Sequence, residues 1–485
     1  MTSPIDRARR RPRLASPSLD PLALAVTDLI GPIYARLALR LSSVSFVKSE
    51  TLIEALRDFY EGRSRLILAF RHPYGDEPQL LTMALRHGIG SEARKRGRPL
   101  PLRPHCLFLH GYEVPLWSGP LVRWLLPRTG AMPIYHVRMD GAGLRRIRAS
   151  LRDGAHPIAL APEGQSSYRS ETVPRLEKGS FQLAFWCAEE LEAASRPEKV
   201  TILPITVHES HDDRDLPALE EACAVLEAQI GFQPVAQTGT DEAEAVASAA
   251  AEAPASDASE ASAGKGQASH KRRRALGLRL RALDLALLAA AEAYYGLDRP
   301  SSLAPREARR FRLFEEALGR GENMLGIKAE GDSINRVYRL RHEGWNRVFP
   351  ESDPAQLPPR LRAVADRRAG EAWYAMRHME LVDLGYYLDA AYLEEGLAEG
   401  RAPSVGRLSE TLHNLYDFAQ RLSGDNISGR PRLLPRRLVL GSAEPLEIRS
   451  RLPDYHRDRR AALDKAEADL ASAWRHSIKE ILDEK

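Results

Sequence analysis

The segment Leu66–Pro78, LILAFRHPYGDEP, places a histidine directly after an apolar run and carboxylates shortly behind it. The chain between His72 and Glu77 can turn back on itself, because Gly75 is conformationally permissive and Pro78 suits the first turn of a helix. A carboxylate bonded to one imidazole nitrogen fixes the tautomer and stabilises the protonated ring. The spacing therefore predicts a histidine base that takes the proton from a hydroxyl group.

Alternatives remain open from this segment alone. A histidine near an acid at a helix start is more often a cap or a turn contact than a catalytic base. Asp76 stands beside Glu77 and either competes for the ring of His72 or caps the following helix. No Ser, Cys or Thr in a G-x-S-x-G-type setting stands nearby, which favours a substrate hydroxyl as the nucleophile.

A second stretch, IALAPEGQSSYRSETVPRLEKGSFQLAFWCAEE, follows a strand-like run with Pro-Glu-Gly, a polar turn and a Lys-Gly pair that opens an amphipathic helix. With it, the chain resembles the glycerolipid (lysophospholipid and glycerol-3-phosphate) acyltransferase family. That family carries an H-x4-D block, a G-x-I-P-I-x-R block, a P-E-G-T-R-S…K-x-G block and an apolar strand ending in proline. The matching blocks, in order over roughly residues 45–210, are RHPYGDEP, GAMPIYH (Gly130–His136), APEGQSSYRS…LEKGSFQLA and TILPITV (Thr201–Val207).

The resemblance implies roles for individual residues. His72 is the base that activates an acceptor hydroxyl for attack on an acyl thioester, and Glu77 is its orienting partner. Glu163 and Gly164 help to hold the acceptor. The donor is a thioester of coenzyme A or of acyl carrier protein, which is a co-substrate, and no metal or other cofactor is expected. We expect the thioester carbonyl near the N-terminus of the helix after the first block, where free N–H groups stabilise an oxyanion.

The sequence departs from the family pattern at the positions that would bind phosphate. The residues that replace the family's acid, its second-block arginine and its Thr-Arg pair are Glu77, His136, Gln165 and Ser166. Arginine suits phosphate because it binds bidentately. Basic residues close by that could substitute are Arg138, Arg169, Arg175 and Lys178. The alternative is that the acceptor has no phosphomonoester and is a lysophospholipid diester or another hydroxylated lipid.

Composition limits the class of protein. A chain of 485 residues with 43% hydrophobic content can bury a sizeable core in more than one folding unit. A net charge of +4 gives no general case for nucleic-acid binding, and no fold motif supports one. Three cysteines without C-x-x-C spacing argue against a disulfide framework or a zinc site and suit a reducing compartment.

The N-terminal region carries weak targeting signals. The basic cluster Arg7–Arg13 precedes an apolar stretch, Leu22–Leu41, that charged residues interrupt and Gly31-Pro32 breaks. This is neither a clear signal peptide nor a transmembrane helix. We expect a cytoplasmic protein, peripheral to the inner face of the membrane, with an anionic membrane surface as partner. The cluster and the helix after Pro21 bind that surface, or the cluster is a solvated tail.

Alternating strands and helices predict the fold class. Apolar runs at 66–70, 106–109, 157–161 and 200–207 predict buried strands, and helical patterns lie at about 50–61, 77–87, 141–152 and 178–193. We therefore expect an α/β fold with a mixed, largely parallel sheet flanked by helices, glycerol-3-phosphate acyltransferase-like by resemblance. His72 follows a strand end, where such sheets form their ligand crevice.

Five segments organise the chain. They are a basic tail and amphipathic helix (1–44), the α/β core (45–211), a low-complexity linker (236–270), a helical region (271–435) and a strand plus long helix that returns to the core (436–485).

Trp117 and Trp124 lie in GYEVPLWSGPLVRWLLP, which forms a core helix, an acyl-chain tunnel or a membrane-facing surface.

These observations predict an O-acyltransferase that moves a fatty acyl group from a thioester to a lysophospholipid or glycerol-phosphate-type acceptor, in phospholipid synthesis or remodelling. Two rivals remain. One is an acyl-thioester hydrolase on the same scaffold, and the other is a catalytically silent lipid-binding or assembly protein.

Overall fold

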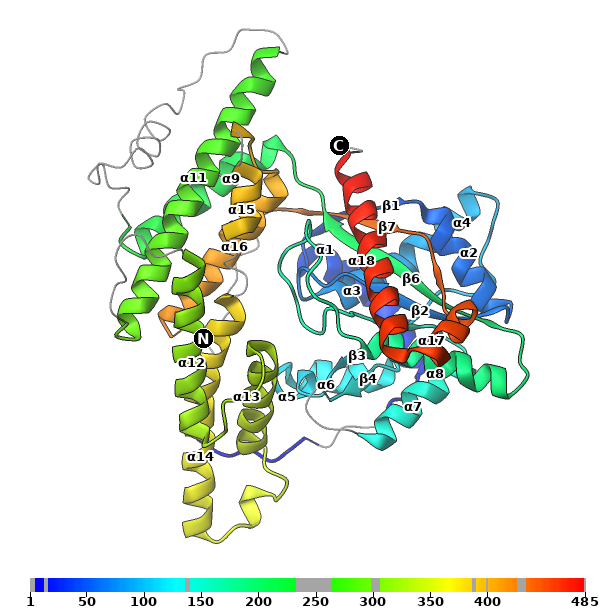
Figure 1. Ribbon diagram of the computed structural model, residues 1–485, viewed down its shortest axis with the longest axis horizontal. Coiled ribbons are helices and arrows are strands. Elements are labelled where there is room, and N and C mark those ends of the chain that lie inside the picture. Colours follow the sequence, from blue (N-terminus) through cyan, green and yellow to red (C-terminus); the bar gives the residue numbers. More distant parts are fainter. Residues whose placement is uncertain are drawn as a thin grey trace. The chain divides into compact units, whose positions relative to one another are not determined.

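The structure of this chain is a computed structural model (Figure 1). It describes residues 5–12, 16–135, 140–232, 263–297, 306–385, 390–397, 400–424 and 433–483. The chain forms two compact units. An α/β unit contains Arg13–Ser210 and Pro435–Lys485, and a helical unit contains Met1–Pro12 and His211–Leu434.

The α/β unit is built on one eight-stranded sheet with the order β1-β7-β6-β2-β5-β3-β4, in which β8 also pairs with β6. The strands are β1 (Leu41–Val47), β2 (Ser64–Phe70), β3 (Leu107–Gly111), β4 (Met132–Ile134), β5 (Ile158–Leu160), β6 (Lys199–Glu209), β7 (Arg436–Ser442) and β8 (Leu446–Glu447). The run from β6 to β4 is parallel, and β7 is antiparallel to β6 and parallel to β1. The expected α/β fold with a mixed, largely parallel sheet is confirmed.

Strand β2 shows why the sheet is buried on both faces. Leu66, Leu68 and Phe70 belong to one apolar core, and the intervening Ile67 and Ala69 belong to the other. Successive side chains of a strand point to opposite faces, so a continuous apolar run requires helices on both sides.

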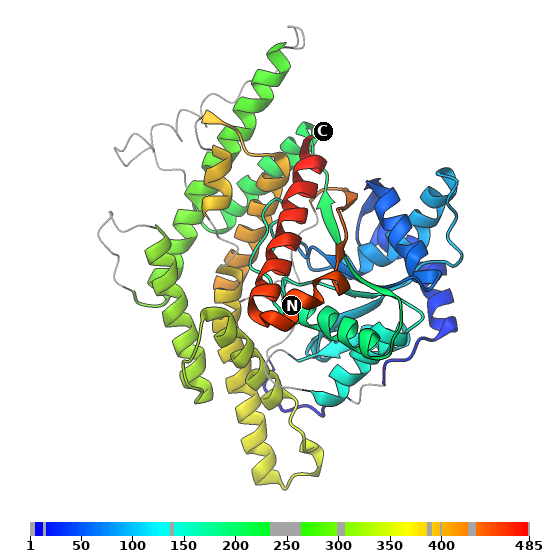
Figure 2. The same ribbon diagram turned by 45° about the vertical axis from the view of Figure 1, so that its right-hand side comes forward.

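Helices cover the two faces, as Figures 1 and 2 show for α18 (red) and for α2 and α4 (blue). One core contains residues of α2 (Ser49–Tyr60), α3 (Glu77–Met83), the π-helical turn η1 (Ala84–Ile89) and α4 (Gly90–Lys95). The other contains residues of α7 (Gly141–Asp153), α8 (Gly179–Ala193), α17 (Leu452–Arg457) and α18 (Arg459–Asp483). The remaining helices are α1 (Pro21–Leu37), α5 (Val114–Trp117) and α6 (Gly119–Arg128).

The N-terminal region differs from the sequence-based expectation. Helix α1 continues through Pro32 rather than breaking there, and β1 already begins at Leu41. Residues 5–12 are not a solvated tail, because they belong to the helical unit. Within it, the Arg9 amide donates to the Val348 carbonyl (2.8 Å) and the Ala8 amide to Asp366 (2.9 Å).

The helical unit follows β6 in the sequence and ends before β7. Its main helices are α9 (Leu216–Gln229), α11 (Ala263–Tyr294), α12 (Arg306–Leu325), α13 (Ser333–Val348), α14 (Pro359–Gly385), α15 (Ala390–Leu397) and α16 (Val405–Leu422). Residues 236–262 of the predicted linker lie outside the described residues, whereas 263–270 already belong to α11. The terminal segment returns to the sheet through β7, with α18 packed against it.

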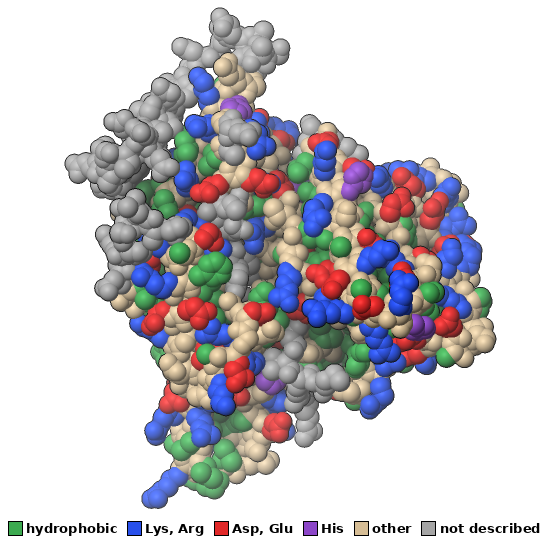
Figure 3. Space-filling view, viewed as in Figure 1, with side chains coloured by type: hydrophobic (Ala, Val, Ile, Leu, Met, Phe, Trp, Pro, Cys, Tyr) green, Lys and Arg blue, Asp and Glu red, His purple; other side chains and the backbone are tan. Residues whose placement is uncertain are grey.

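Two general features follow from the described residues. None of the helices in that part of the chain is both long and apolar enough to cross a membrane. On the face drawn in Figure 3, basic and acidic side chains are interspersed rather than gathered by sign.

Candidate active site

The loops that follow β2 and β5 meet at one edge of the sheet. The two strands are parallel neighbours with Ala69 beside Leu160, so the residues after them emerge side by side. The Ser167 amide donates to the His72 carbonyl (2.9 Å), and the His72 amide donates to Glu163 Oε1 (3.0 Å). Two of the sequence blocks are therefore joined directly by hydrogen bonds.

His72 and Glu77 form the pair that their spacing predicts. His72 Nδ1 lies 2.5 Å from Glu77 Oε2, and the Glu77 side chain is fully buried. The amides of Tyr74 and Gly75 also donate to the Glu77 carboxylate, and Gly75 has a φ of +90° that glycine tolerates. Because a carboxylate only accepts, Nδ1 carries the proton and the Nε2 lone pair is available as a base.

The pKa of His72 is raised above its usual value of 6.5. Burial alone lowers this pKa, but the charge and hydrogen bond of Glu77, with the charges of Glu163 and Asp76, outweigh that effect. The His72 side chain remains 19% exposed. The ring is thus a stronger base than free histidine and is accessible to a small group.

Asp76 is paired with an arginine that lies far from it in the sequence. Both Asp76 carboxylate oxygens accept from the Arg436 guanidinium, at the start of β7, which also pairs with Glu209 at the end of β6. The Asp76 side chain does not cap α3. Of the two acids that the sequence left in competition, Glu77 contacts His72, and Asp76 acts on it through charge alone.

A buried ion pair fixes the loop after β5. Arg71 Nε donates to Glu163 Oε1 (2.5 Å), and both side chains are almost completely buried. The Arg71 guanidinium also donates to the carbonyls of Arg169, Ser170 and Thr172. Glu163, which the resemblance assigns to acceptor binding, is here committed to Arg71 and to the backbone of His72.

Ser166 contacts the free side of the imidazole. Its Oγ lies 3.1 Å from His72 Nε2, in the turn that begins at Gly164, where φ is +74°. Gln165 is half-buried beside it, and its Oε1 has no hydrogen-bond partner among the described residues. The sequence-based expectation concerned a serine in a G-x-S-x-G-type setting, and Ser166 does not stand in one. Its contact with His72 comes from the fold and not from nearness in the sequence.

The remaining predicted site residues are His136 and the four basic residues that could bind phosphate. His136 and Arg138 lie outside the described residues. Arg169 contributes its backbone carbonyl to the Arg71 cluster. Lys178 precedes α8 at the surface and forms an ion pair with Asp464 of α18. Arg175, another cation that the sequence offered for phosphate, is exposed in the loop before α8. The phosphate-binding role of Arg138, Arg169, Arg175 and Lys178 stays a prediction.

The amides around the start of α3 are largely occupied. Those of Tyr74 and Gly75 donate to Glu77, and those of Gln79 and Leu80 donate to the Asp76 carbonyl. These four groups do not form the oxyanion site that we expected there. Within the described part of the chain, no cluster of three or more His, Cys, Asp or Glu residues is arranged to hold a metal ion.

Sequence reasoning missed two arginines, Arg71 and Arg436, and the contact of Ser166 with His72. Arg71 immediately precedes His72, so its position was visible although its partner was not. Arg436 opens a strand that was expected to rejoin the sheet, but nothing local links it to Asp76. Comparisons of the chain with models of protein families, with curated proteins and with solved structures find no match.

Proposed function

We propose that the α/β unit is an O-acyltransferase of the glycerolipid acyltransferase type. It moves a fatty acyl group from a coenzyme A or acyl carrier protein thioester to a hydroxyl of a lysophospholipid or glycerol-phosphate-type acceptor. The observation that carries the proposal is the placement of the His72 imidazole. Glu77 orients Nδ1 of this ring, and Nε2 lies within hydrogen-bond distance of the hydroxyl oxygen of Ser166.

The arrangement of the sequence blocks supports the same reading. The first and third blocks are bonded to each other through His72, Glu163 and Ser167, and the fourth block forms β6 beside β2. The second block contains β4, a parallel neighbour of β3 in the same sheet. Blocks separated by many residues thus belong to one sheet, as a single active site of the glycerol-3-phosphate acyltransferase-like fold would require.

Acceptor choice follows from the cations at the site. Arg71 is consumed by Glu163 and backbone carbonyls, and Arg436 by Asp76 and Glu209. Neither is placed to bind a phosphomonoester. We therefore propose a lysophospholipid diester, or another hydroxylated lipid, as the acceptor on the ground that these two arginines are already paired, while His136 and Arg138 lie outside the described residues.

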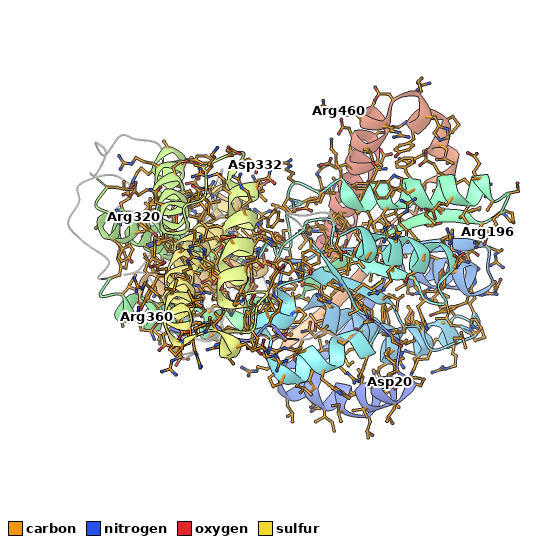
Figure 4. All side chains as sticks on the ribbon, turned by 90° about the horizontal axis from the view of Figure 1, so that it is seen from below. Asp20, Arg196, Arg320, Asp332, Arg360 and Arg460 are labelled. Atoms are coloured by element: carbon orange, nitrogen blue, oxygen red, sulfur yellow. The ribbon has the colours of Figure 1, made fainter. Side chains whose placement is uncertain are left out.

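The outer face of α1 supports action at a membrane surface. Its exposed residues Leu22, Val26, Leu29, Ile30, Ile33, Tyr34 and Leu37 recur at helical spacing, whereas its buried residues are the small Ala23, Gly31 and Ala35. In Figure 4 the side chains of α1, which begins beside the labelled Asp20, extend outward. Helix α6 contacts α1 and exposes further apolar residues, Leu121, Val122 and Trp124.

Such a face suits the headgroup region of a bilayer. Exposed aliphatic and tryptophan side chains insert there, and basic residues attract an anionic surface. Arg36 is exposed on α1, and Arg128 lies 4.6 Å over the ring of Trp124. The proposal therefore places the enzyme on an anionic membrane that supplies its acceptor.

Mass spectrometry of lipid products tests the activity. The purified full chain receives acyl-coenzyme A or acyl carrier protein thioesters and, separately, lysophosphatidate, lysophospholipids and glycerol 3-phosphate. We expect a new acylated lipid, and we expect His72→Ala to lower its rate of formation by about 10²–10⁴-fold because the general base is lost. His456→Ala, at an exposed histidine of α17, is the matched control and should leave the rate unchanged.

Three outcomes decide the matter. A product that requires His72 supports the transferase and identifies the acceptor. Thioester loss that yields only free fatty acid would replace the transferase with a hydrolase on the same site. A folded protein, judged by circular dichroism, that turns over neither donor with any acceptor would overturn the proposal.

A further inference from the structure

Three side chains at the candidate site form a linear chain of contacts. Glu77 Oε2 lies 2.5 Å from His72 Nδ1, and Ser166 Oγ lies 3.1 Å from His72 Nε2. A carboxylate, an imidazole and a serine hydroxyl in this order have the geometry that activates a serine for nucleophilic attack. Such arrangements are recognised by their geometry and not by the order of the residues in the sequence.

Hydrogen bonds of the surrounding loops fix the position of Ser166. The amide of the next residue, Ser167, donates to the His72 carbonyl at 2.9 Å. The loop beyond it is held by the buried Arg71, which donates to three of its backbone carbonyls. Gly75 faces the hydroxyl, since a Cβ added there would lie 3.4 Å from Ser166 Oγ. The hydroxyl and the imidazole are thus held together from both loops.

We infer that Ser166 is a covalent nucleophile and that the acyl group passes through an ester on Ser166 Oγ. The inference rests on the proposed function for its donor, an acyl thioester. It differs from that function in its mechanism, because the acceptor hydroxyl then attacks an enzyme-bound ester and not the thioester itself.

The chemistry balances with the three residues present. Ser166 Oγ attacks the thioester carbonyl carbon while its proton moves to His72 Nε2, and the imidazolium is stabilised by Glu77. The C–S bond breaks, and the leaving thiolate takes that proton and departs as a free thiol. An acceptor hydroxyl, or water, then gives its proton to His72 and attacks the acyl-serine. The C–Oγ bond breaks, and Ser166 regains its proton from His72.

Direct transfer from the thioester to the acceptor, without an acyl-serine, predicts a different effect of removing the Ser166 hydroxyl. If His72 deprotonates the acceptor itself, the acceptor oxygen must occupy the place beside Nε2 that Ser166 Oγ now holds. Removal of the serine hydroxyl would then leave the rate unchanged or raise it. The two mechanisms therefore differ in sign for one substitution.

The experiment compares the full-length wild type with Ser166→Ala, His72→Ala and Ser167→Ala. Ser167 is the matched control, because its hydroxyl faces the Arg169 carbonyl at 3.4 Å and not the imidazole. Each protein is mixed with a long-chain acyl-coenzyme A, and free thiol and intact protein mass are followed. We expect an acyl adduct on Ser166 in the wild type and in Ser167→Ala. We expect Ser166→Ala to lose at least as much rate as His72→Ala. A double variant that combines Ser166→Ala with His72→Ala should lose no more rate than Ser166→Ala alone, since the residues act as a unit.

A fluorophosphonate probe, which loses fluoride when a serine oxygen attacks its phosphorus, separates this inference from the proposed function. Labelling of Ser166 that requires His72, without any thioester turnover, would support the nucleophile and overturn the proposed donor. His72-dependent transfer that persists in Ser166→Ala without an adduct would overturn the nucleophile and keep the transferase. Absence of both labelling and adduct in the wild type would overturn the inference.

Discussion

Two regions of the α/β unit have features that are unfavourable for folding: one buries charges, and the other exposes apolar side chains. At the sheet edge, the charges of Arg71, Glu77 and Glu163 are buried. On α1, large apolar side chains are exposed, with Leu29 76% and Ile33 61% accessible. Buried charges and exposed apolar surface both cost free energy, and either is more informative than an ordinary core.

The two regions differ in whether these side chains have partners within the α/β unit. At the sheet edge Arg71 pairs with Glu163, and Glu77 pairs with His72, so each of these buried charges has a partner within the α/β unit. On the inner side of α1, Asp28 accepts from Arg86 and Arg103, whereas the large apolar residues named above are exposed. The first region is the one that we propose for chemistry, and the second is the one that we propose for contact with a membrane surface.

The largest expected effect is on the stability of the sheet edge. Arg71→Met leaves Glu163 buried without a counter-charge, and we expect it to cost about 3–5 kcal/mol of unfolding free energy. Arg436→Met leaves Asp76 and Glu209 partly exposed to water, so we expect about 1–3 kcal/mol. Hydrogen exchange of peptides from β2 and β6, measured by mass spectrometry, reports on this unit alone.

A surface pair provides the control for these two arginines. Arg451 pairs with Asp469 of α18, and both side chains are partly exposed, 26% and 41% respectively. Arg451→Met should therefore cost no more than about 1 kcal/mol. Equal protection in Arg71→Met and Arg451→Met would contradict a tightly satisfied ionic edge.

The next effect concerns the proton on His72. Because its pKa is raised, the acidic limb of kcat/KM should lie above pH 6.5, where the free base forms. Glu77→Gln removes the main stabilising charge, so the limb should move to lower pH while the maximal rate falls. Asp76→Asn, whose charge acts more weakly, should move it less. Titration of the His72 ring by NMR, with His72→Ala for assignment, checks the same pKa without turnover.

The sign of the accompanying stability change follows from the same pair. A histidine whose pKa is raised by folding contributes stability that is fully present below pH 6.5 and is lost as pH rises through its folded-state pKa. The wild type should therefore lose stability relative to Glu77→Gln over that interval. A limb at or below pH 6.5 in the wild type would contradict the geometry of the pair.

Much of the sheet could be predicted because its central strands are continuous apolar runs. Strands β2, β3, β5 and β6 were each expected within a few residues of their bounds. Strands β1 and β4 were not expected. β1 has three serines in seven residues, and β4 has only three residues, so neither composition nor length distinguishes them.

The candidate site was predictable where partners are close in sequence. His72 and Glu77 are five residues apart, and one turn brings them together. Arg436 and Asp76 are 360 residues apart, and only the antiparallel pairing of β7 with β6 brings the arginine to this edge. The Ser166 contact likewise depends on the parallel neighbours β2 and β5. Long-range pairing of this kind leaves no local signal in the sequence.

The smallest expected change in stability belongs to the apolar face. Leu29→Asp with Ile33→Asp replaces exposed side chains, so we expect unfolding free energy to change by no more than about 0.5 kcal/mol per site. Membrane binding should change far more. Burial of each aliphatic side chain is worth about 1.5–3 kcal/mol, so the double variant should bind anionic vesicles at least about 10²-fold more weakly.

Co-sedimentation with vesicles of phosphatidylcholine and phosphatidylglycerol measures this binding. Val225→Asp changes an exposed aliphatic residue of α9 in the helical unit and should leave binding intact. If the α1 variant loses vesicle binding and retains turnover of a detergent-dispersed acceptor, the two regions are separable, one for contact and one for chemistry. If vesicle binding is unchanged, the exposed face of α1 serves a partner other than lipid, and the acceptor must reach His72 by another route.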